Sequence, residues 1–120
     1  DTVLRVAVFV GDRHDAGADL DQVYALEDGH RARDAALMRG DEQVATVVDL
    51  PWGENDPTHV DRARATAGRV MLAGGLGPEN VEEAIVAVAP WAVDSARSTE
   101  REPGIKDHEL IRRWVEAANA

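Results

Sequence analysis

Apolar runs alternate with segments of helical periodicity along this chain, and that alternation restricts its possible folds more than any other feature. Short apolar runs of the kind that form strands occupy residues 3–10, 44–51, 69–76 and 91–98. Segments with apolar residues at helical spacing occupy residues 19–30, 56–68, 78–90 and 107–120. Strands that alternate with helices predict βα units in a parallel sheet, and therefore an α/β fold.

One segment fits two predictions. Residues 34–42 form either a short strand that leads into a turn or the end of a longer helix from Glu27, because alanine and arginine are good helix formers. In parallel α/β folds the functional residues lie where the strands end, in the loops that lead to the helices. We therefore expect the site in those loops.

Composition excludes several classes of protein. The 120 residues suffice for a single domain, 1–120, and the net charge of −10 is spread along the chain without the basic patch of a nucleic-acid binder. No apolar run approaches the ~20 residues of a membrane span, and no signal peptide opens the chain, which predicts a cytoplasmic protein without membrane contact. The sequence starts at Asp1 rather than Met, which indicates a processed, truncated or incomplete chain.

Metal and thiol chemistry are not expected. The chain has no cysteine, which excludes disulfides, thiolate metal ligands and cysteine nucleophiles. Its histidines show no metal-ligand spacing; they are His14, His30, His59 and His108.

A glycine-rich junction at residues 70–88, VMLAGGLGPENVEEAIVAV, joins a strand directly to an amphipathic helix. Glycines at such a junction let the backbone approach a ligand closely, and the following helix offers unpaired N–H groups that suit an anion. Gly74, Gly75 and Gly77 are therefore candidates for a phosphate cradle. The same glycines also fit a tight turn that holds no ligand.

Residues 69–119 closely resemble the C-terminal end of the phosphoribosylanthranilate isomerase family, whose members are (βα)8 TIM barrels of tryptophan biosynthesis. The matching motifs are LAGGLGPENVEEAI, a strand with "VD" and small residues, and PGIKD before a helix. The resemblance implies a fold derived from that barrel, and incomplete here, because a whole barrel needs ~200 residues.

Residues 3–49 resemble the same family more loosely. RVAVFV is similar to the third barrel strand, and LMRGDE is similar to the fourth, with Arg39 where the family usually has histidine. VVDLP is similar to the sixth strand, whose closing aspartate is the family's general acid, so this alignment gives that role to Asp49. A rival alignment makes 44–50 the fifth strand, and Asp49 then loses the role.

The resemblance implies an isomerase that converts N-(5-phosphoribosyl)anthranilate into 1-(2-carboxyphenylamino)-1-deoxyribulose 5-phosphate by an Amadori rearrangement. A general acid protonates the ring oxygen of the sugar, and a general base then removes the proton from C2. The chemistry requires no metal and no organic cofactor. Asp49 would be the acid, with its pKa raised by burial, unless it is a helix-cap or turn residue.

The resemblance also implies a site for the substrate phosphate. The phosphate would lie on the backbone of Gly74 and Gly75 and on the loop after the last strand, where Ala96, Arg97 and Ser98 stand. Asp94 matches a family aspartate near the sugar, and Arg39 is a further candidate for substrate binding. Trp52 is either a packing residue or a platform for the anthranilate ring.

Two departures from the family suggest a second hypothesis. The family's general base is a cysteine on the first strand, and this chain has no cysteine and nothing like the first two strands. The alternative is a non-catalytic phosphosugar-binding fragment, or a barrel fragment that completes itself by association. In either case we expect a monomer or a homodimer and a small phosphosugar as ligand.

Overall fold

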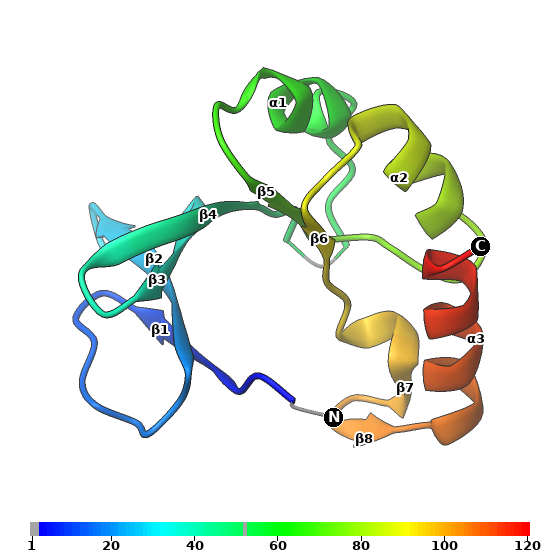
Figure 1. Cartoon of the computed structure of the whole chain (residues 1–120), viewed down its shortest axis with the longest axis horizontal. Coiled ribbons are helices and arrows are strands. Elements are labelled where there is room, and N and C mark those ends of the chain that lie inside the picture. The colour runs from blue at the N-terminus through cyan, green and yellow to red at the C-terminus, as the bar shows by residue number, and fades with distance from the viewer. Residues whose placement is uncertain (1–2, 52) are drawn as a thin grey trace.

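The computed structural model of the chain describes residues 3–51 and 53–120, and contains a six-stranded sheet and a small two-stranded one (Figure 1). The six neighbouring strands of the larger sheet follow chain order: β1 (Val6–Val10), β2 (Leu20–Glu27), β3 (His30–Arg39), β4 (Glu42–Val48), β5 (Val70–Leu72) and β6 (Ala92–Val93). The other elements are α1 (His59–Ala65), α2 (Val81–Val88), the short 3-10 helix η1 (Arg97–Thr99), β7 (Glu100–Glu102), β8 (Ile105–Lys106) and α3 (His108–Ala118).

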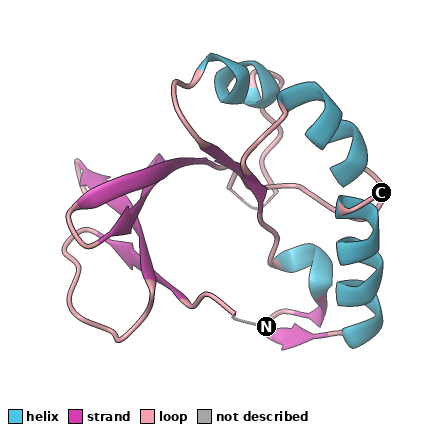
Figure 2. Ribbon diagram, in the orientation of Figure 1, coloured by secondary structure: helices cyan, strands magenta, loops and turns pink. Residues whose placement is uncertain are grey.

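The C-terminal half of the sheet follows the predicted βα order. Strands β4, β5 and β6 are parallel, with α1 between the first two and α2 between the last two. The sheet curls, and the three helices lie on its outer side (Figures 1 and 2). This arrangement confirms an α/β fold of the incomplete-barrel type.

The N-terminal half differs from the prediction. The expected helix at residues 19–30 is wrong, because these residues form strand β2 and the turn that follows it. Residues 34–42, for which the sequence allowed either a strand or the end of a helix, fall mostly in strand β3. Strand β2 pairs in parallel with β1, but β2, β3 and β4 pair antiparallel, so the expected all-parallel sheet is also wrong here.

Burial explains why residues 20–27 form a strand. Leu20, Gln22 and Tyr24 alternate as buried residues along β2, which is the period of a strand rather than a helix. Gln22 hides this period in the sequence because it is polar. Its burial is stabilised by a hydrogen bond from its Nε2 to the Tyr24 hydroxyl, at 2.8 Å.

Two tight turns set the antiparallel register. Asp28 and Gly29 join β2 to β3, and both have positive φ (51° and 78°), as a type I′ hairpin turn requires. Gly40 and Asp41 join β3 to β4, with Gly40 at φ 58°. The Asp-Gly pair is a recognised hairpin signal, so this turn was open to prediction from sequence.

The core has two layers, one on each face of the sheet. Val48 and Leu72 pack on the outer face against the helices, through Ala63 of α1, Val81 of α2 and Trp114 of α3. The neighbouring side chains along the strands point to the opposite, inner face, where they form a second cluster: Leu20, Tyr24, Ala35, Leu37, Ala45, Val47 and Ala73.

Strand β1 is an open edge of the sheet. Val6, Val8 and Val10 are 41%, 62% and 48% exposed, although a valine-rich strand is usually covered on both faces.

Within the described residues, no helix is both long and apolar enough to cross a membrane.

Candidate functional site

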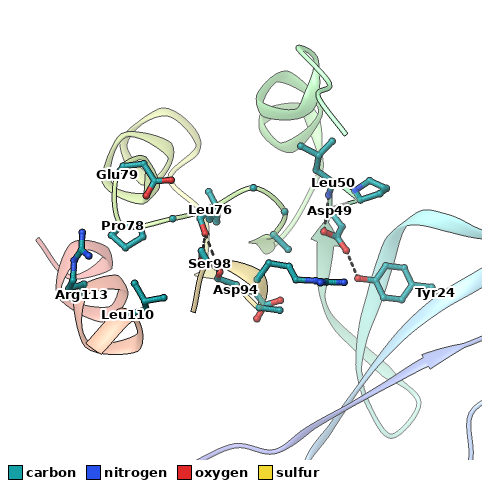
Figure 3. Close-up of a pocket in the computed structure, with 18 of the residues that line it drawn as sticks. Tyr24, Asp49, Leu50, Leu76, Pro78, Glu79, Asp94, Ser98, Leu110 and Arg113 are labelled. Atoms are coloured by element: carbon teal, nitrogen blue, oxygen red, sulfur yellow. Dashed lines mark hydrogen bonds between the residues drawn. The ribbon is translucent and has the colours of Figure 1, made fainter. Parts of the chain in front are cut away.

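A pocket of about 670 Å³ opens where the parallel strands β4, β5 and β6 end (Figure 3). The carboxyl ends of parallel strands share one edge of a sheet, so the loops that follow them meet there. The main lining comes from three loops, 49–51, 73–79 and 94–98, and from α3 through Leu110 and Arg113.

The pocket brings together nearly all of the residues predicted from sequence. Asp49 follows β4, and Asp94 follows β6. The five predicted phosphate-binding residues also line this pocket: Gly74, Gly75, Ala96, Arg97 and Ser98. Their roles as acid, sugar ligand and phosphate ligands stay predictions.

Arg39 is the exception, because the structure does not bring it to this pocket. It ends strand β3 and pairs with Glu42 at the start of β4, whereas Asp49 follows the other end of β4. The prediction assumed a parallel β3. Since β3 is antiparallel to β4, its last residue lies at the edge of the sheet away from the pocket.

The reversal of β3 instead brings Arg31 to the pocket, together with Tyr24 from β2. The Arg31 guanidinium carbon lies 4.0 Å from the centre of the Tyr24 ring, which is a cation–π contact. Sequence reasoning missed both residues because it assigned a helix to 19–30.

Asp49 is held by hydrogen-bond donors on both carboxylate oxygens. The Tyr24 hydroxyl donates to Oδ2 at 2.6 Å (Figure 3). Arg31 donates to the same oxygen at 3.4 Å, and the Leu50 backbone N–H donates to Oδ1 at 2.8 Å. The Asp49 side chain is only 16% exposed, so these donors replace most of its water.

The backbone of Asp49 is braced from behind by an ion pair. Arg62 of α1 donates through Nη1 to both carboxylate oxygens of Asp34, at 3.2 and 3.1 Å. Arg62 Nη2 donates to the Asp49 carbonyl, and Asp34 Oδ1 accepts from the Asp49 N–H, both at 3.2 Å. The end of β4 is thereby fixed to α1 and β3.

Two side chains of the pocket have shifted pKa values. Three causes together raise the pKa of Tyr24 to about 12. Burial is the largest, followed by the hydrogen bond to Asp49 and the negative charge of Asp49. Partial loss of hydration next to the surrounding protein raises the pKa of Asp94, and the negative charge of Asp49 raises it further. Asp94 stays open to solvent through the pocket, so water weakens both influences on it.

Glycine is required at the junction after β5. Gly74 has φ +87°, and a Cβ added there would lie 2.6 Å from the Leu50 carbonyl oxygen. Gly75 has φ +70°. Asn80 fixes the loop that follows, because its Oδ1 accepts from the Gly77 N–H at 2.8 Å and its Nδ2 donates to the Gly75 carbonyl at 2.9 Å.

The carbonyl of Leu76 accepts hydrogen bonds from three side chains. Ser98 Oγ donates to it at 2.6 Å, and Ser95 Oγ donates at 3.1 Å. The indole Nε1 of Trp114 in α3 donates at 3.2 Å. The two βα loops of the expected phosphate site are therefore tied to each other and to α3.

Among the described residues, no group of three or more acidic or histidine side chains is placed to hold a metal ion. Trp52, considered as a platform for an aromatic ring, lies outside the described residues.

Comparison with known proteins decides the family. The family model of N-(5'-phosphoribosyl)anthranilate isomerase (PRAI) matches residues 34–117. The chain belongs to the PRAI family. A relative from Geobacter sp. (strain M21), named N-(5'-phosphoribosyl)anthranilate isomerase, is 53% identical over 126 aligned residues, which cover 85% of this chain and 61% of the relative. A relative of the same name from Haloferax volcanii is 41% identical, over 73% of this chain and 42% of the relative.

The chain is shorter than its PRAI relatives in two respects. It spans less than two thirds of the length of either relative. The Geobacter alignment also has 126 positions while covering only 85% of a 120-residue chain, so that relative has residues within the matched span that this chain lacks. The crystal structure of the PRAI of Thermotoga maritima has the same fold over 98% of this chain and 73% of its own, with TM-score 0.70 and 22% identity.

Strand pairing bears on the two alignments considered for residues 44–50. In the PRAI resemblance, β5 and β6 stand for the last two strands of the barrel. Strand β4 is hydrogen-bonded directly to β5. The pairing is the one expected if β4 stands for the sixth strand, and the role of Asp49 as its closing aspartate stays a prediction.

Proposed function

We propose that this chain supplies the phosphate cradle and the carboxylates of an isomerase site for N-(5-phosphoribosyl)anthranilate, a phosphorylated aminoaldose of tryptophan biosynthesis in the cytoplasm. The observation that carries the proposal is that Asp49, Asp94 and the glycine junction line one pocket. Membership of the PRAI family supports the same reaction.

The pocket has the groups that such a substrate needs. Gly74, Gly75 and the loop with Arg97 and Ser98 line it, and backbone N–H groups with an arginine suit a phosphate. Gly74 lies against the backbone of Leu50, the residue after Asp49, so the glycine junction and the Asp49 carboxylate are neighbours. Ser98 and Asp94 lie on the opposite side of the pocket from Tyr24 (Figure 3).

The rearrangement needs one proton donated to the ring oxygen and one proton removed from C2. The PRAI resemblance gives the first step to Asp49. The second step belongs in the family to a cysteine that these 120 residues do not contain. Two carboxyls in one pocket are nevertheless able to divide donor and acceptor roles between them when their surroundings differ.

Asp49→Asn tests the catalytic part of the proposal. We expect turnover of N-(5-phosphoribosyl)anthranilate, followed by NMR at C1 and C2, to fall by a factor on the order of 100 or more. We expect the affinity for inorganic phosphate, measured by calorimetry, to change little, because the cradle is made by other residues. Asp41→Asn is the matched control, because Asp41 lies in the β3–β4 turn and is fully exposed.

If Asp49→Asn retained the activity of the unmodified chain, the catalytic role of Asp49 would be refuted. If the unmodified chain bound phosphate but showed no turnover, the second hypothesis would hold, namely a phosphosugar-binding fragment without catalysis.

A further inference from the structure

The end of strand β4 is held by side chains where a neighbouring strand would ordinarily hold it. The antiparallel pairing of β3 with β4 stops at Ala35 and Val47, two residues before Asp49. The Asp49 N–H donates instead to the side chain of Asp34, through Oδ1 at 3.2 Å. Aspartate is uncommon inside a strand, and here its carboxylate takes the place of a backbone acceptor.

The carbonyl of Asp49 is held from α1. Arg62 donates through Nη2 to this carbonyl at 3.2 Å, and through Nη1 to both carboxylate oxygens of Asp34, at 3.2 and 3.1 Å. One planar guanidinium therefore fixes both the Asp49 carbonyl and the acceptor of the Asp49 N–H. A lysine ammonium is a point charge and lacks this fork.

A second carboxylate faces the remaining nitrogen of the same guanidinium. Arg62 Nε is buried and makes no hydrogen bond to the described residues, but it lies 3.6 Å from Asp56 Oδ2. Asp56 also forms an ion pair with Arg33 of β3, at 3.5 Å. The fork of Arg62 is therefore held on two sides, by charges from β3 and from the loop before α1.

The backbone contacts of Asp49 are separate from its contacts inside the pocket. Its carboxylate accepts from the Tyr24 hydroxyl at 2.6 Å and from the Leu50 N–H at 2.8 Å, and all three residues line the pocket. Asp34 and Arg62 do not line the pocket. A substrate can therefore displace the contacts of the carboxylate while the backbone of Asp49 stays fixed.

We infer, on the basis of the proposed function, that Asp34 and Arg62 are positioning residues for the isomerase reaction. They hold the backbone of Asp49 so that its carboxyl faces the pocket in one fixed direction, and they act only through Asp49. A displacement of ~1 Å at a reacting group can slow a reaction by a factor of about 100, so a fixed backbone has a direct effect on rate.

Arg62→Lys tests the fork, because it keeps the positive charge and removes the planar geometry. We expect kcat for N-(5-phosphoribosyl)anthranilate to fall by a factor of roughly 10 to 100. We expect KM to change little, because the phosphate cradle is made by other residues. Arg64→Lys is the matched control, because Arg64 is an exposed residue of the same helix, and it should leave both constants unchanged.

Asp34 allows a graded test of the acceptor. Asp34→Asn keeps a side-chain oxygen for the Asp49 N–H, whereas Asp34→Ala removes it. We expect the asparagine variant to recover much of the kcat that the alanine variant loses. Urea unfolding of each variant separates this effect from a loss of folded protein.

Tyr24 reports the position of the Asp49 carboxyl without requiring turnover. Burial is the largest cause of its pKa of about 12, and the hydrogen bond to Asp49 is the next. Arg62→Lys and Asp34→Ala should therefore lower the pKa of Tyr24 towards 10.0, each by less than Asp49→Asn does. Arg64→Lys should leave it unchanged. The absorbance of tyrosinate measures this pKa.

The outcomes distinguish this inference from the proposed function. If folded Arg62→Lys and Asp34→Ala chains kept the kcat and the Tyr24 pKa of the unmodified chain, the inference would be overturned and the proposed function would stand. A change in only one of the two measurements would also overturn it, because the two residues would then not act through the position of Asp49. If the unmodified chain showed no turnover, the catalytic part of the proposed function would be refuted, and the inference with it.

Discussion

Tyr24 makes the shortest hydrogen bond to the Asp49 carboxylate, at 2.6 Å. It is 3% exposed, donates to Asp49 and accepts from Gln22, so its hydroxyl is fully engaged. It is also the only tyrosine in the chain, so its ionisation can be followed without ambiguity.

Asp49→Asn should lower the pKa of Tyr24 from about 12, because the hydrogen bond and the charge of Asp49 both favour the protonated hydroxyl. The pKa should stay above the ordinary value of 10.0, because burial is the largest cause of the shift. Absorbance of tyrosinate during an alkaline titration measures it. An unchanged titration would mean that Tyr24 and Asp49 are not in contact.

The same shift predicts how stability depends on pH. The pKa of Tyr24 is higher in the folded chain than in the unfolded chain, so its contribution is fully present below pH 10 and disappears as pH rises through about 12. The shift sets an upper limit of a few kcal/mol on this contribution. Urea unfolding at several pH values should show this loss, and Tyr24→Phe should remove this component of the pH dependence.

Gly74→Ala should destabilise the chain and weaken phosphate binding. Its Cβ would strike the Leu50 backbone in addition to the strain of φ +87°. Gly17→Ala is the matched control, because Gly17 has φ +71° but nothing within 4 Å of an added Cβ. We expect a loss of ~1–2 kcal/mol for the control and a larger loss for Gly74→Ala, measured by urea unfolding. Equal losses would show that the collision is relieved without cost.

At the scale of elements, the two halves of the sheet differ in how far the sequence predicts them. The βα units after residue 44 have clear apolar runs, a glycine junction and, directly before the last helical segment, Asp107, a residue type that favours helix N-caps. Asp107 does cap α3, because its carboxylate accepts from the N–H groups of Glu109 and Leu110. The family resemblance predicts Asp49 and Asp94 as site residues; both follow strands in the structure, and their roles stay predictions.

The hairpin half was harder to predict, for a physical reason. Gln22 interrupts the apolar pattern of β2, and only its partner Tyr24, two residues away, makes its burial favourable. The direction of β3 depends on the Asp28–Gly29 turn rather than on its own residues. Arg31 and Arg39 lie near opposite ends of the same strand, so the direction of that strand decides which arginine lies at the pocket.

Asp107→Ala should destabilise α3, because two N–H groups at its start lose their acceptor. We expect a loss of ~1 kcal/mol in the free energy of unfolding. His108→Ala is the control, since His108 starts the same helix without capping it. A smaller loss for Asp107→Ala than for His108→Ala would mean that the cap does not stabilise the chain.

At the scale of the whole molecule, an open sheet edge competes with charge repulsion. Strand β1 exposes Val6, Val8 and Val10, and exposed edges of this kind favour pairing with another chain. The net charge of −10 opposes such pairing between copies. Salt screens repulsion between chains without weakening the burial of apolar side chains.

We therefore expect self-association to increase with salt, as measured by analytical ultracentrifugation at several protein concentrations. Val8→Lys should reduce this association, because a charged side chain on the edge disfavours pairing. Val86→Lys is the control, because Val86 is 81% exposed but belongs to α2. Equal effects of the two substitutions would show that the β1 edge is not the contact.

Two sides of the pocket come from separate stretches of sequence. Residues 20–39 form one continuous hairpin that presents Tyr24 and Arg31, whereas residues 73–98 hold the glycine junction and the serine loop. Under the proposed function, substitutions in the hairpin alter the hairpin side of the pocket and leave the residues of the proposed phosphate cradle in place. In evolution or in the laboratory, the two sides of the pocket can therefore change one at a time.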